Sequence, residues 1–305
     1  MTKKFYSNGK LLITGEYVVL DGAHALAIPT KYGQDLVVEE GINRQIKWTS
    51  FDFDGSIWFE NVFTFDEISN PDYIQKTDSV RSTLLEILRE AYLASPKFIN
   101  ESDGYTIKTH LTFPKFWGLG TSSTLINNIA QWLQIDAFQL LNNSFGGSGY
   151  DIACAQNDTP VLYRLEYGKP VVEIINYKPM FSDNLYFVYL NRKQSSKAAI
   201  RSYYKNKNED LAHTLSQIDK ITNKIIEASN LQTFGRLIEN HEAILSEVLE
   251  MKTVKETFFA DFNGSIKSLG GWGGDFILVA ANENPTSYFT HLGFKTVIPY
   301  NEMAL

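Results

Sequence analysis

Apolar and polar residues alternate through several segments in the first half of the chain. Runs rich in β-branched and aromatic residues, separated by turn signals such as Asp54-Gly55, predict β-strands. Two similar runs around Gly168-Lys169-Pro170 predict a hairpin, and continuous apolar runs further on predict buried strands. The predicted strands cover residues 10–19, 34–39, 45–49, 57–65, 105–111, 161–167, 171–177, 185–190, 276–281 and 295–299.

Helical periodicity, with apolar residues three and four positions apart, marks segments between these strands. The helix predicted over residues 79–94 ends near Ser95-Pro96, because proline disfavours helical backbone in the residue before it. Other helices are predicted over residues 124–133, from residue 152, and over 195–204, 209–228, 231–249 and 285–292. This mixture of strands and helices predicts an α+β fold.

Length and charge bound the kind of protein. A chain of 305 residues with 44% hydrophobic and 21% charged residues is globular and longer than one typical domain. We expect one domain over residues 1–180 and a second over residues 181–305. The formal net charge of −7 argues against nucleic acid as a partner and favours a small-molecule substrate at a local basic patch.

The cysteine, the histidines and the apolar runs argue against a disulfide, a zinc site and a membrane-spanning segment. A single cysteine, Cys154, excludes an intramolecular disulfide and suits a reducing cytosol, and its small neighbours predict a packed thiol. The histidines lack the spacing of a zinc site. No targeting sequence and no apolar run of about 18 residues is present, so we expect a cytoplasmic protein without membrane partners.

The most informative segment is PKFWGLGTSS, residues 114–123, which leads into a predicted helix. Glycines permit positive φ and close approach to an anion, and the N–H groups and dipole at a helix N-terminus favour negative charge. It is not a Walker P-loop, because no Gly-Lys-Ser/Thr follows the required spacer. The structural alternative is a plain Gly-rich turn in which Ser or Thr is the helix N-cap.

Three further Gly-bearing segments accompany it: SNGKLLITGEYVVLDG over residues 7–22, GGSGYDIACA over 146–155 and KSLGGWGGD over 267–275. Together the four segments resemble those of the GHMP kinases, the superfamily of galactokinase, homoserine kinase, mevalonate kinase and phosphomevalonate kinase. In order, they are similar to the family's Pro-Gly-Lys…Gly-Glu-(His/Tyr) motif, its Pro-x-x-x-Gly-Leu-Gly-Ser-Ser phosphate loop, its Ser-Gly-x-Asp loop and its C-terminal Gly-rich loop. Gly15-Glu16-Tyr17 and the Gly-Gly-Asp ending at Asp275 are most similar to phosphomevalonate kinases.

The resemblance implies a two-domain GHMP kinase fold, with an N-terminal domain like ribosomal protein S5 domain 2 and a ferredoxin-like C-terminal domain. It implies an ATP-dependent, Mg²⁺-using kinase that transfers the γ-phosphate to an alcohol or phosphate of a small substrate. Mevalonate or phosphomevalonate is the substrate that the resemblance favours, which would place the protein in isoprenoid biosynthesis. A homodimer is one oligomeric state open to it. The alternatives are a sugar or sugar-phosphate kinase and a non-catalytic GHMP-like ligand-binding protein.

Two residues carry the predicted chemistry. Asp151 could accept the proton of an attacking alcohol or orient it, although an Asp after a Gly-rich turn could instead N-cap the helix from Ile152. Lys10 could keep that carboxylate ionised and neutralise the transferred charge, or it could be a surface lysine at a strand end. Period-two alternation puts Lys10 and Glu16 on one strand face, unless Gly15 carries a bulge.

The remaining site residues follow from the resemblance. ATP is expected to bind Gly118, Leu119, Gly120, Thr121, Ser122 and Ser123, and Ser122 is also expected to contact Mg²⁺. Substrate is expected to contact Glu16, Tyr17, Ser148, Ser196, Lys197, Gly271 and Asp275. The residues around Ser196 and Lys197 are rich in cations and hydroxyls, which suits a carboxylate or phosphate, or alternatively a capped helix with a charged face.

Two departures from the family pattern stand out. The stretch FQLLNN over residues 138–143 has no acid where the family usually carries a metal-binding Glu. Mg²⁺ keeps several waters and needs only one or two protein ligands, so this loss does not by itself exclude a metal. Trp272 stands where the family has Gly, so we expect a local variation of that turn and a packing role for the indole.

Overall fold

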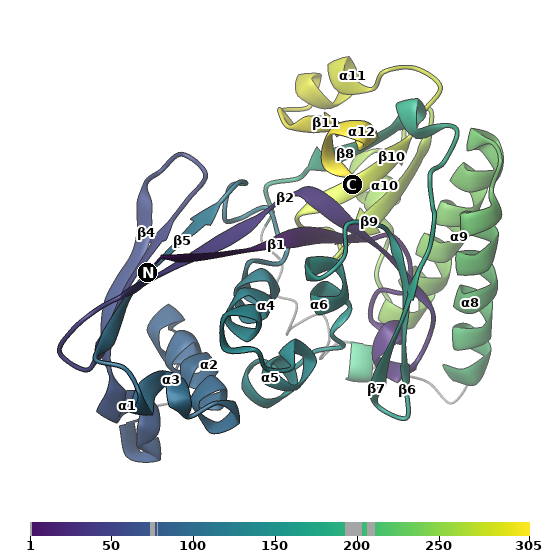
Figure 1. Ribbon diagram of the computed structural model, residues 1–305. Helices are drawn as coiled ribbons and strands as arrows, with labels where there is room; N and C mark the ends of the chain where they lie inside the picture. The colour runs from purple at the N-terminus through teal and green to yellow at the C-terminus, as the bar shows by residue number, and fades with distance from the viewer. Residues whose placement is uncertain (1, 74–76, 78, 193–202, 206–210) are drawn as a thin grey trace. The chain divides into compact units, whose positions relative to one another are not determined.

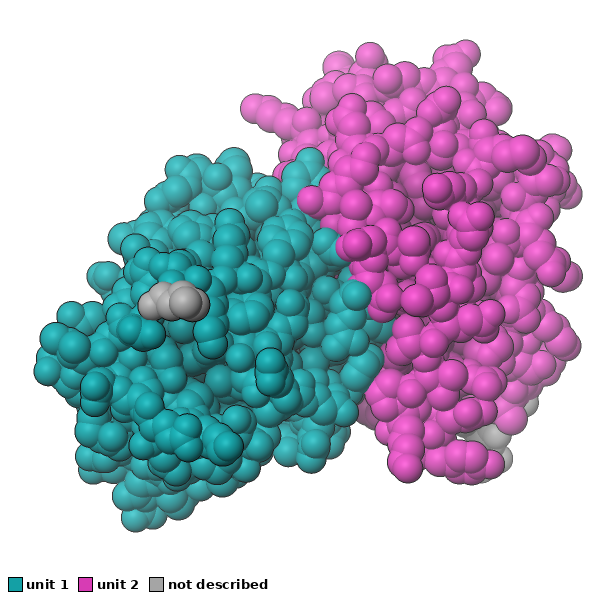
Figure 2. All heavy atoms as spheres, in the orientation of Figure 1, with its two compact units in different colours: residues 1–9, 32–115, 119–156 teal, residues 10–31, 116–118, 157–305 magenta. Residues whose placement is uncertain are grey.

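The computed structural model describes residues 2–73, 77, 79–192, 203–205 and 211–305 (Figure 1). Most of the predicted helix at 195–204 lies outside these described residues. Ser196 and Lys197 both belong to the part that is not described. The chain divides into two compact units (Figure 2). Unit 1 comprises Met1–Gly9, Tyr32–Lys115 and Leu119–Gln156, and unit 2 comprises Lys10–Lys31, Phe116–Gly118 and Asn157–Leu305. The units are discontinuous in sequence, and the expected domain boundary near residue 180 stays a prediction.

Unit 1 combines a mixed sheet with helices. The second half of β2 (Ala25–Glu40) pairs antiparallel with β5 (Gly104–Leu111), β5 pairs parallel with β3 (Gln45–Phe51), and β3 pairs antiparallel with β4 (Ile57–Thr64). Strand β1 (Lys3–Leu12) also pairs with β2. The helices are α1 (Phe65–Ser69), α2 (Val80–Ala94), α3 (Lys97–Asn100), α4 (Thr121–Leu133), α5 (Ala137–Ser144) and α6 (Tyr150–Ala155), with a 3-10 turn η2 (Pro71–Tyr73).

The apolar faces of these elements form one core. Trp48 and Ile107 are register partners on β3 and β5, and both are buried with residues of α2 and α4 such as Leu88 and Ile126. Helix α2 begins at Ser79, whose hydroxyl accepts the N–H of Ser82, as the capping preference of serine predicts. The alternation along the strands therefore places one face of the sheet under the helices.

Unit 2 holds the start of β2, which pairs with β6 (Val161–Glu166), and the hairpin from β6 to β7 (Lys169–Ile174). A second, antiparallel sheet has the order β11 (Val297–Pro299), β8 (Leu185–Tyr189), β10 (Phe276–Ala280) and β9 (Ser265–Leu269). The long helices α8 (Leu211–Glu227) and α9 (Leu231–Leu249) pack together, and α9 packs against β9 (Figure 1). The shorter elements are η1 (Val18–Asp21), η3 (Ser182–Asn184), α10 (Val254–Phe258), α11 (Thr286–His291) and α12 (Tyr300–Met303).

Most predicted elements are confirmed, and the α+β class with them. The strand predicted over residues 10–19 is wrong in its second half, because β1 ends at Leu12 and η1 follows. Beyond the end of β1 the backbone turns at Gly15, where φ is 87°, and an added Cβ would lie 2.8 Å from the Cβ of Ala25. The alternation that was expected to put Lys10 and Glu16 on one face therefore does not reach Glu16.

Candidate functional site

The phosphate loop leads into α4 without a side-chain cap. Gly118 has φ 70°, and Gly120, in the left-handed conformation at φ 93°, is the N-cap residue with no side-chain cap hydrogen bond. The N-cap residue is therefore neither Ser nor Thr, because the three hydroxyl residues lie inside the first helical turn. By contrast, Asp136 caps α5 by accepting two backbone N–H groups. The first N–H groups of α4 are thus left without the intramolecular acceptor that a side-chain cap supplies.

Buried polar contacts hold α4 in place inside unit 1. The Thr124 hydroxyl donates to the side-chain oxygen of Gln34 at 2.7 Å, and the Asn128 amide donates to the Gln34 carbonyl at 2.9 Å. Ser7 on β1 donates to Asn128 at 2.8 Å. Leu119, between the two loop glycines, is fully buried. These contacts fix the direction of the helix and the start of its first turn.

A second Gly-rich turn leads into α6. Gly149, with φ 92°, is its N-cap residue, again without a side-chain cap hydrogen bond, and Ser148 before it is buried. Asp151 lies in the first turn of the helix and is not its N-cap, so the capping alternative for this residue is wrong. Helix α6 packs on α4, where the Asn127 amide donates to the Ala155 carbonyl at 3.3 Å. Unit 1 therefore brings the uncapped helix α4 and the helix of Asp151 into direct contact.

In unit 2, Lys10 and Asp275 both lie at Gly118, the first glycine of the phosphate loop. The Lys10 ammonium donates to the Gly118 carbonyl at 3.2 Å, so this half-buried lysine contacts the loop backbone. A Cβ built on Gly118 would lie 2.2 Å from Oδ2 of Asp275. The structure therefore joins three of the predicted site residues within one unit.

Glu16 lies in a buried cluster of ionisable side chains. Its carboxylate pairs with the ammonium of Lys267, and Glu16, Lys267, His241 and Glu242 are all at most 3% exposed. The Gly15 N–H donates to Nε2 of His241 at 2.9 Å, which leaves the ring proton on Nδ1 when the imidazole is neutral. Both carboxylate oxygens of Glu242 lie 3.1 Å from the backbone nitrogen of Ser268. Glu16 thus has partners within the unit, and its expected contact with substrate stays a prediction.

Burial sets the protonation of this cluster. It lowers the pKa of His241 well below its usual value, with a further contribution from the Lys267 charge. Burial raises the pKa of Glu16 and raises that of Glu242 to about 7, although Lys267 opposes both shifts. One buried lysine therefore faces two carboxylates, and full ionisation of both is unfavourable.

Tyr17 is tied to the C-terminal Gly-rich loop. Its hydroxyl accepts the Trp272 N–H at 2.8 Å and donates to the Gly270 carbonyl at 3.4 Å. Trp272 is 5% exposed, and its indole N–H donates to the Lys252 carbonyl, so the expected packing role is confirmed. Positive φ angles fall on Gly270 and Gly273 and not on Trp272. The turn therefore varies locally so that the residue with the indole avoids left-handed backbone, as expected. Gly271, between them, is buried.

Within the described residues, no group of three or more His, Cys, Asp or Glu side chains could hold a metal ion. Over the same residues, none of the helices combines the length and the apolar character needed to cross a bilayer.

No family model and no curated protein matches the sequence. Solved structures do match over nearly the whole chain. Mevalonate kinase from Methanococcus jannaschii superimposes with a TM-score of 0.69 at 16% identity, covering 97% of this chain and 96% of that one. Phosphomevalonate kinase from Streptococcus pneumoniae, solved with phosphomevalonate and AMPPNP, gives 0.67 at 16% identity and covers 96% of both chains. Galactokinase from Lactococcus lactis, solved with galactose, gives 0.68 at 14% identity and covers 98% and 94%.

The chain has the GHMP kinase fold. The resemblance inferred from the four Gly-bearing segments is thereby confirmed at the level of the fold.

Sequence analysis did not identify His241, Glu242 and Lys267, which form the buried ionisable cluster with Glu16. A signal was present in α9, where Phe234, Ile238, Leu245 and Leu249 mark the buried face at spacings of four and seven. The polar pair at 241 and 242 falls on the same buried face. Polar residues at core positions of an amphipathic helix point to buried partners.

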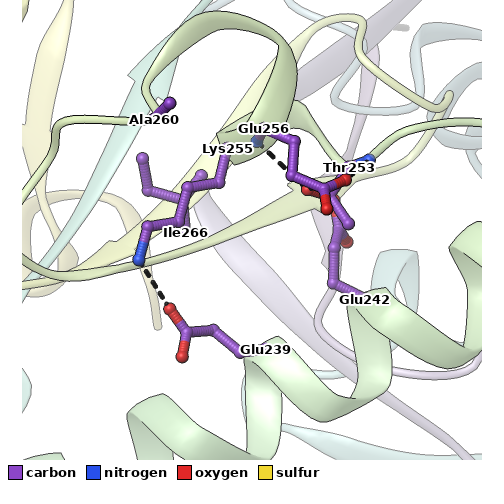
Figure 3. A pocket seen from close by; sticks show the side chains of 7 residues that line it. All are labelled: Glu239, Glu242, Thr253, Lys255, Glu256, Ala260 and Ile266. Carbon is purple, nitrogen blue, oxygen red and sulfur yellow. Dashed lines mark hydrogen bonds and ion pairs between the residues drawn. The ribbon is translucent and has the colours of Figure 1, made fainter.

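A cavity of about 270 Å³ lies in unit 2 at α9, α10 and β9 (Figure 3). Beside it, Lys255 pairs with Glu239 at 2.8 Å and donates to the Gly264 carbonyl at 2.7 Å. Its lining contains none of the predicted site residues but includes Glu242, so the buried cluster borders a hollow large enough for water. The lining consists of Glu239, Glu242, Thr253, Lys255, Glu256, Ala260 and Ile266.

Proposed function

We propose that the protein is an ATP-dependent small-molecule kinase. The observation that carries this proposal is the start of α4, where a left-handed glycine replaces the usual side-chain cap. Five other helices, α1, α2, α5, α9 and α10, begin with a Ser, Thr, Asp or Asn residue whose side chain accepts a backbone N–H. An uncapped helix start after a Gly-rich turn suits the oxygens of a phosphate group, because its N–H groups and dipole favour an anion. A GHMP fold adds weight to this proposal without fixing the substrate.

In this proposal, the loop from Gly118 to Ser123 holds the phosphates of ATP. Lys10, which is anchored on the Gly118 carbonyl, supplies positive charge beside the transferred phosphoryl group. Asp151 accepts the proton of an alcohol or, when the acceptor is a phosphate, orients it.

The Mg²⁺ that a GHMP kinase requires fits the donors present. Ser122 lies in the first turn of α4 and is half-buried, and its hydroxyl is a hard oxygen ligand of the kind Mg²⁺ accepts. When bound, the ion would neutralise charge on the phosphates. The chain's own part is to hold the triphosphate and to position the acceptor.

Mevalonate or phosphomevalonate is our preferred acceptor, because the Gly15-Glu16-Tyr17 and Gly-Gly-Asp segments are most similar to that branch. Tyr17 and Asp275 are the substrate-side residues proposed from those segments, with Ser148 and Gly271. We further propose a cytoplasmic location, which the single buried Cys154 suits.

The test is ADP release from MgATP with a panel of mevalonate, phosphomevalonate, homoserine, galactose and heptose phosphate. We expect activity with one acceptor and a loss of at least about a hundredfold in Asp151→Asn, the scale of a positioned acid–base group. The matched control is Asp103→Asn, an exposed carboxylate of the same unit, which should leave the rate unchanged. Full activity in Asp151→Asn would refute its role, and silence of the wild type across the panel would refute the proposed acceptors.

A further inference from the structure

Ser268, in strand β9, makes three hydrogen bonds that reach different parts of unit 2. Its N–H donates to the Glu242 carboxylate, with both oxygens at 3.1 Å, and its carbonyl accepts the Lys267 ammonium at 2.8 Å. Its hydroxyl accepts the Gly273 N–H at 3.1 Å. Ser268 is 2% exposed. It therefore joins the buried cluster to the turn between β9 and β10, residues 270–275.

A second hydroxyl contacts the same turn. Tyr17 accepts the Trp272 N–H at 2.8 Å and donates to the Gly270 carbonyl at 3.4 Å. Glycine occupies four of the six turn positions, so few side chains are available there to select one backbone form, and glycine has more conformational freedom to lose than any other residue. The hydroxyls of Ser268 and Tyr17 supply that selection, because each accepts one particular backbone N–H of the turn.

The buried cluster links these two hydroxyl residues. Glu16 pairs with Lys267, and each of the two is the direct neighbour in sequence of one hydroxyl residue, Tyr17 or Ser268. Glu16 and Lys267 are at most 3% exposed. A buried ion pair adds little net stability, because the loss of hydration offsets the attraction between the charges, and its best-attested use is to fix one register between elements. The pair thus ties the segment of Tyr17 to the strand of Ser268.

The turn carries two of the residues proposed above to contact the acceptor. Gly271 and Asp275 lie on either side of Gly273 in sequence, and the Gly271 carbonyl accepts the Gly274 N–H at 2.9 Å. Where only one form of a site binds a ligand, the apparent affinity falls in proportion to the population of that form. Loss of the Ser268 hydroxyl would remove the acceptor of the Gly273 N–H and allow the turn to take other forms. The acceptor would then bind more weakly.

We propose that Ser268 is a positioning residue, which fixes the turn between β9 and β10, through Gly273, in the form that binds the acceptor. It acts through the backbone of the turn and not by contact with substrate. This inference rests on the proposed kinase function, and it adds a residue that was not among the expected substrate contacts.

The test is the steady-state kinetics of Ser268→Ala, with mevalonate and with phosphomevalonate as acceptors. Alanine removes only the hydroxyl and keeps the N–H and the carbonyl that contact Glu242 and Lys267, so β9 should be preserved. We expect the KM of the acceptor to rise about tenfold, the scale of one lost hydrogen bond, while the KM of ATP stays unchanged. Amide hydrogen exchange, followed by NMR, gives a readout apart from catalysis, and the Gly273 amide should exchange about tenfold faster in the variant. Ser265→Ala, at the first position of the same strand, is the matched control and should change none of these quantities.

A merely structural role would lower the unfolding midpoint in urea and leave both KM values of the folded enzyme unchanged, and that result would overturn the inference. An equal rise of both KM values would overturn it as well, because the turn would then serve no particular substrate. Faster exchange at Gly273 with an unchanged KM of the acceptor would overturn it by showing that acceptor binding does not depend on the form of the turn. Absence of turnover by the wild type would overturn the proposed function, and this inference with it, while the exchange of Gly273 would still report whether Ser268 holds the turn.

Discussion

The buried cluster makes a pH-dependent prediction for Glu242→Gln. Glutamine keeps an oxygen that can accept the Ser268 N–H but removes the titrating carboxyl. The Glu242 pKa is raised by burial from its ordinary value of 4.5 to about 7, with the Glu16 charge adding to the shift and Lys267 opposing it. Because the pKa of Glu242 is higher in the folded than in the unfolded state, protonation of this carboxyl favours folding. Its contribution to stability is complete below about pH 4.5 and is lost as the pH rises to about 7.

The size of the effect follows from that pKa difference. At about 1.4 kcal/mol per pKa unit, Glu242 contributes about 3 kcal/mol of stability at low pH that is absent at pH 8. His241 acts with the opposite sign, because its lowered pKa favours folding above its ordinary value of 6.5. Comparing variant with wild type at each pH removes this common contribution. Part of this contribution is already lost at pH 5, so relative to the wild type Glu242→Gln should gain about 2.5 kcal/mol between pH 5 and pH 8.

The assay is urea unfolding at a series of pH values, with the unfolding free energy extrapolated to water at each pH. Glu256→Gln, in an exposed capping box on α10, is the control, and its difference from wild type should be nearly flat over this range. A difference for Glu242→Gln that is flat, or that falls with rising pH, would refute the reasoning. It would mean that Lys267 keeps Glu242 ionised and that burial does not dominate.

Two further changes probe the same unit. Lys267→Met should destabilise the fold by about 3 to 5 kcal/mol at pH 8, because it leaves Glu16 and Glu242 buried without their cation. Thermal unfolding measures this, the loss should shrink at pH 5, and a loss below about 1 kcal/mol would contradict the buried pairing. Tyr17→Phe should cost about 1 to 3 kcal/mol, because it leaves the buried Trp272 N–H without its acceptor. Unfolding in urea measures that cost, and unchanged stability would show that water replaces the Tyr17 hydroxyl.

Local sequence signals predicted the elements of the site well. The glycines at 118 and 120 marked the phosphate loop, because their positive φ angles are a local backbone requirement. They did not reveal that Gly120 itself is the N-cap, since propensity favours the hydroxyl residues that follow it. Gly15 was recognised as a place where the strand could fail, and its φ of 87° is incompatible with an extended strand.

The tertiary contacts were beyond local reasoning. The pairing of Glu16 with Lys267 joins residues 251 positions apart, and it depends on how α9 packs on β9. Nothing in either segment encodes that packing by itself. The approach of Asp275 to Gly118 depends likewise on the turn between β9 and β10, whose form is altered by Trp272.

The most direct test of the account is phosphorus NMR of the purified protein with MgATP and each acceptor in turn. If the protein is a kinase, the γ-phosphate resonance of ATP should disappear as ADP and one new phosphoester or diphosphate resonance grow in equal amounts. Asp151→Asn should leave the spectrum of ATP unchanged over the same time. Conversion of ATP to inorganic phosphate alone, or bound ATP that stays intact with every acceptor, would contradict the proposal of phosphoryl transfer.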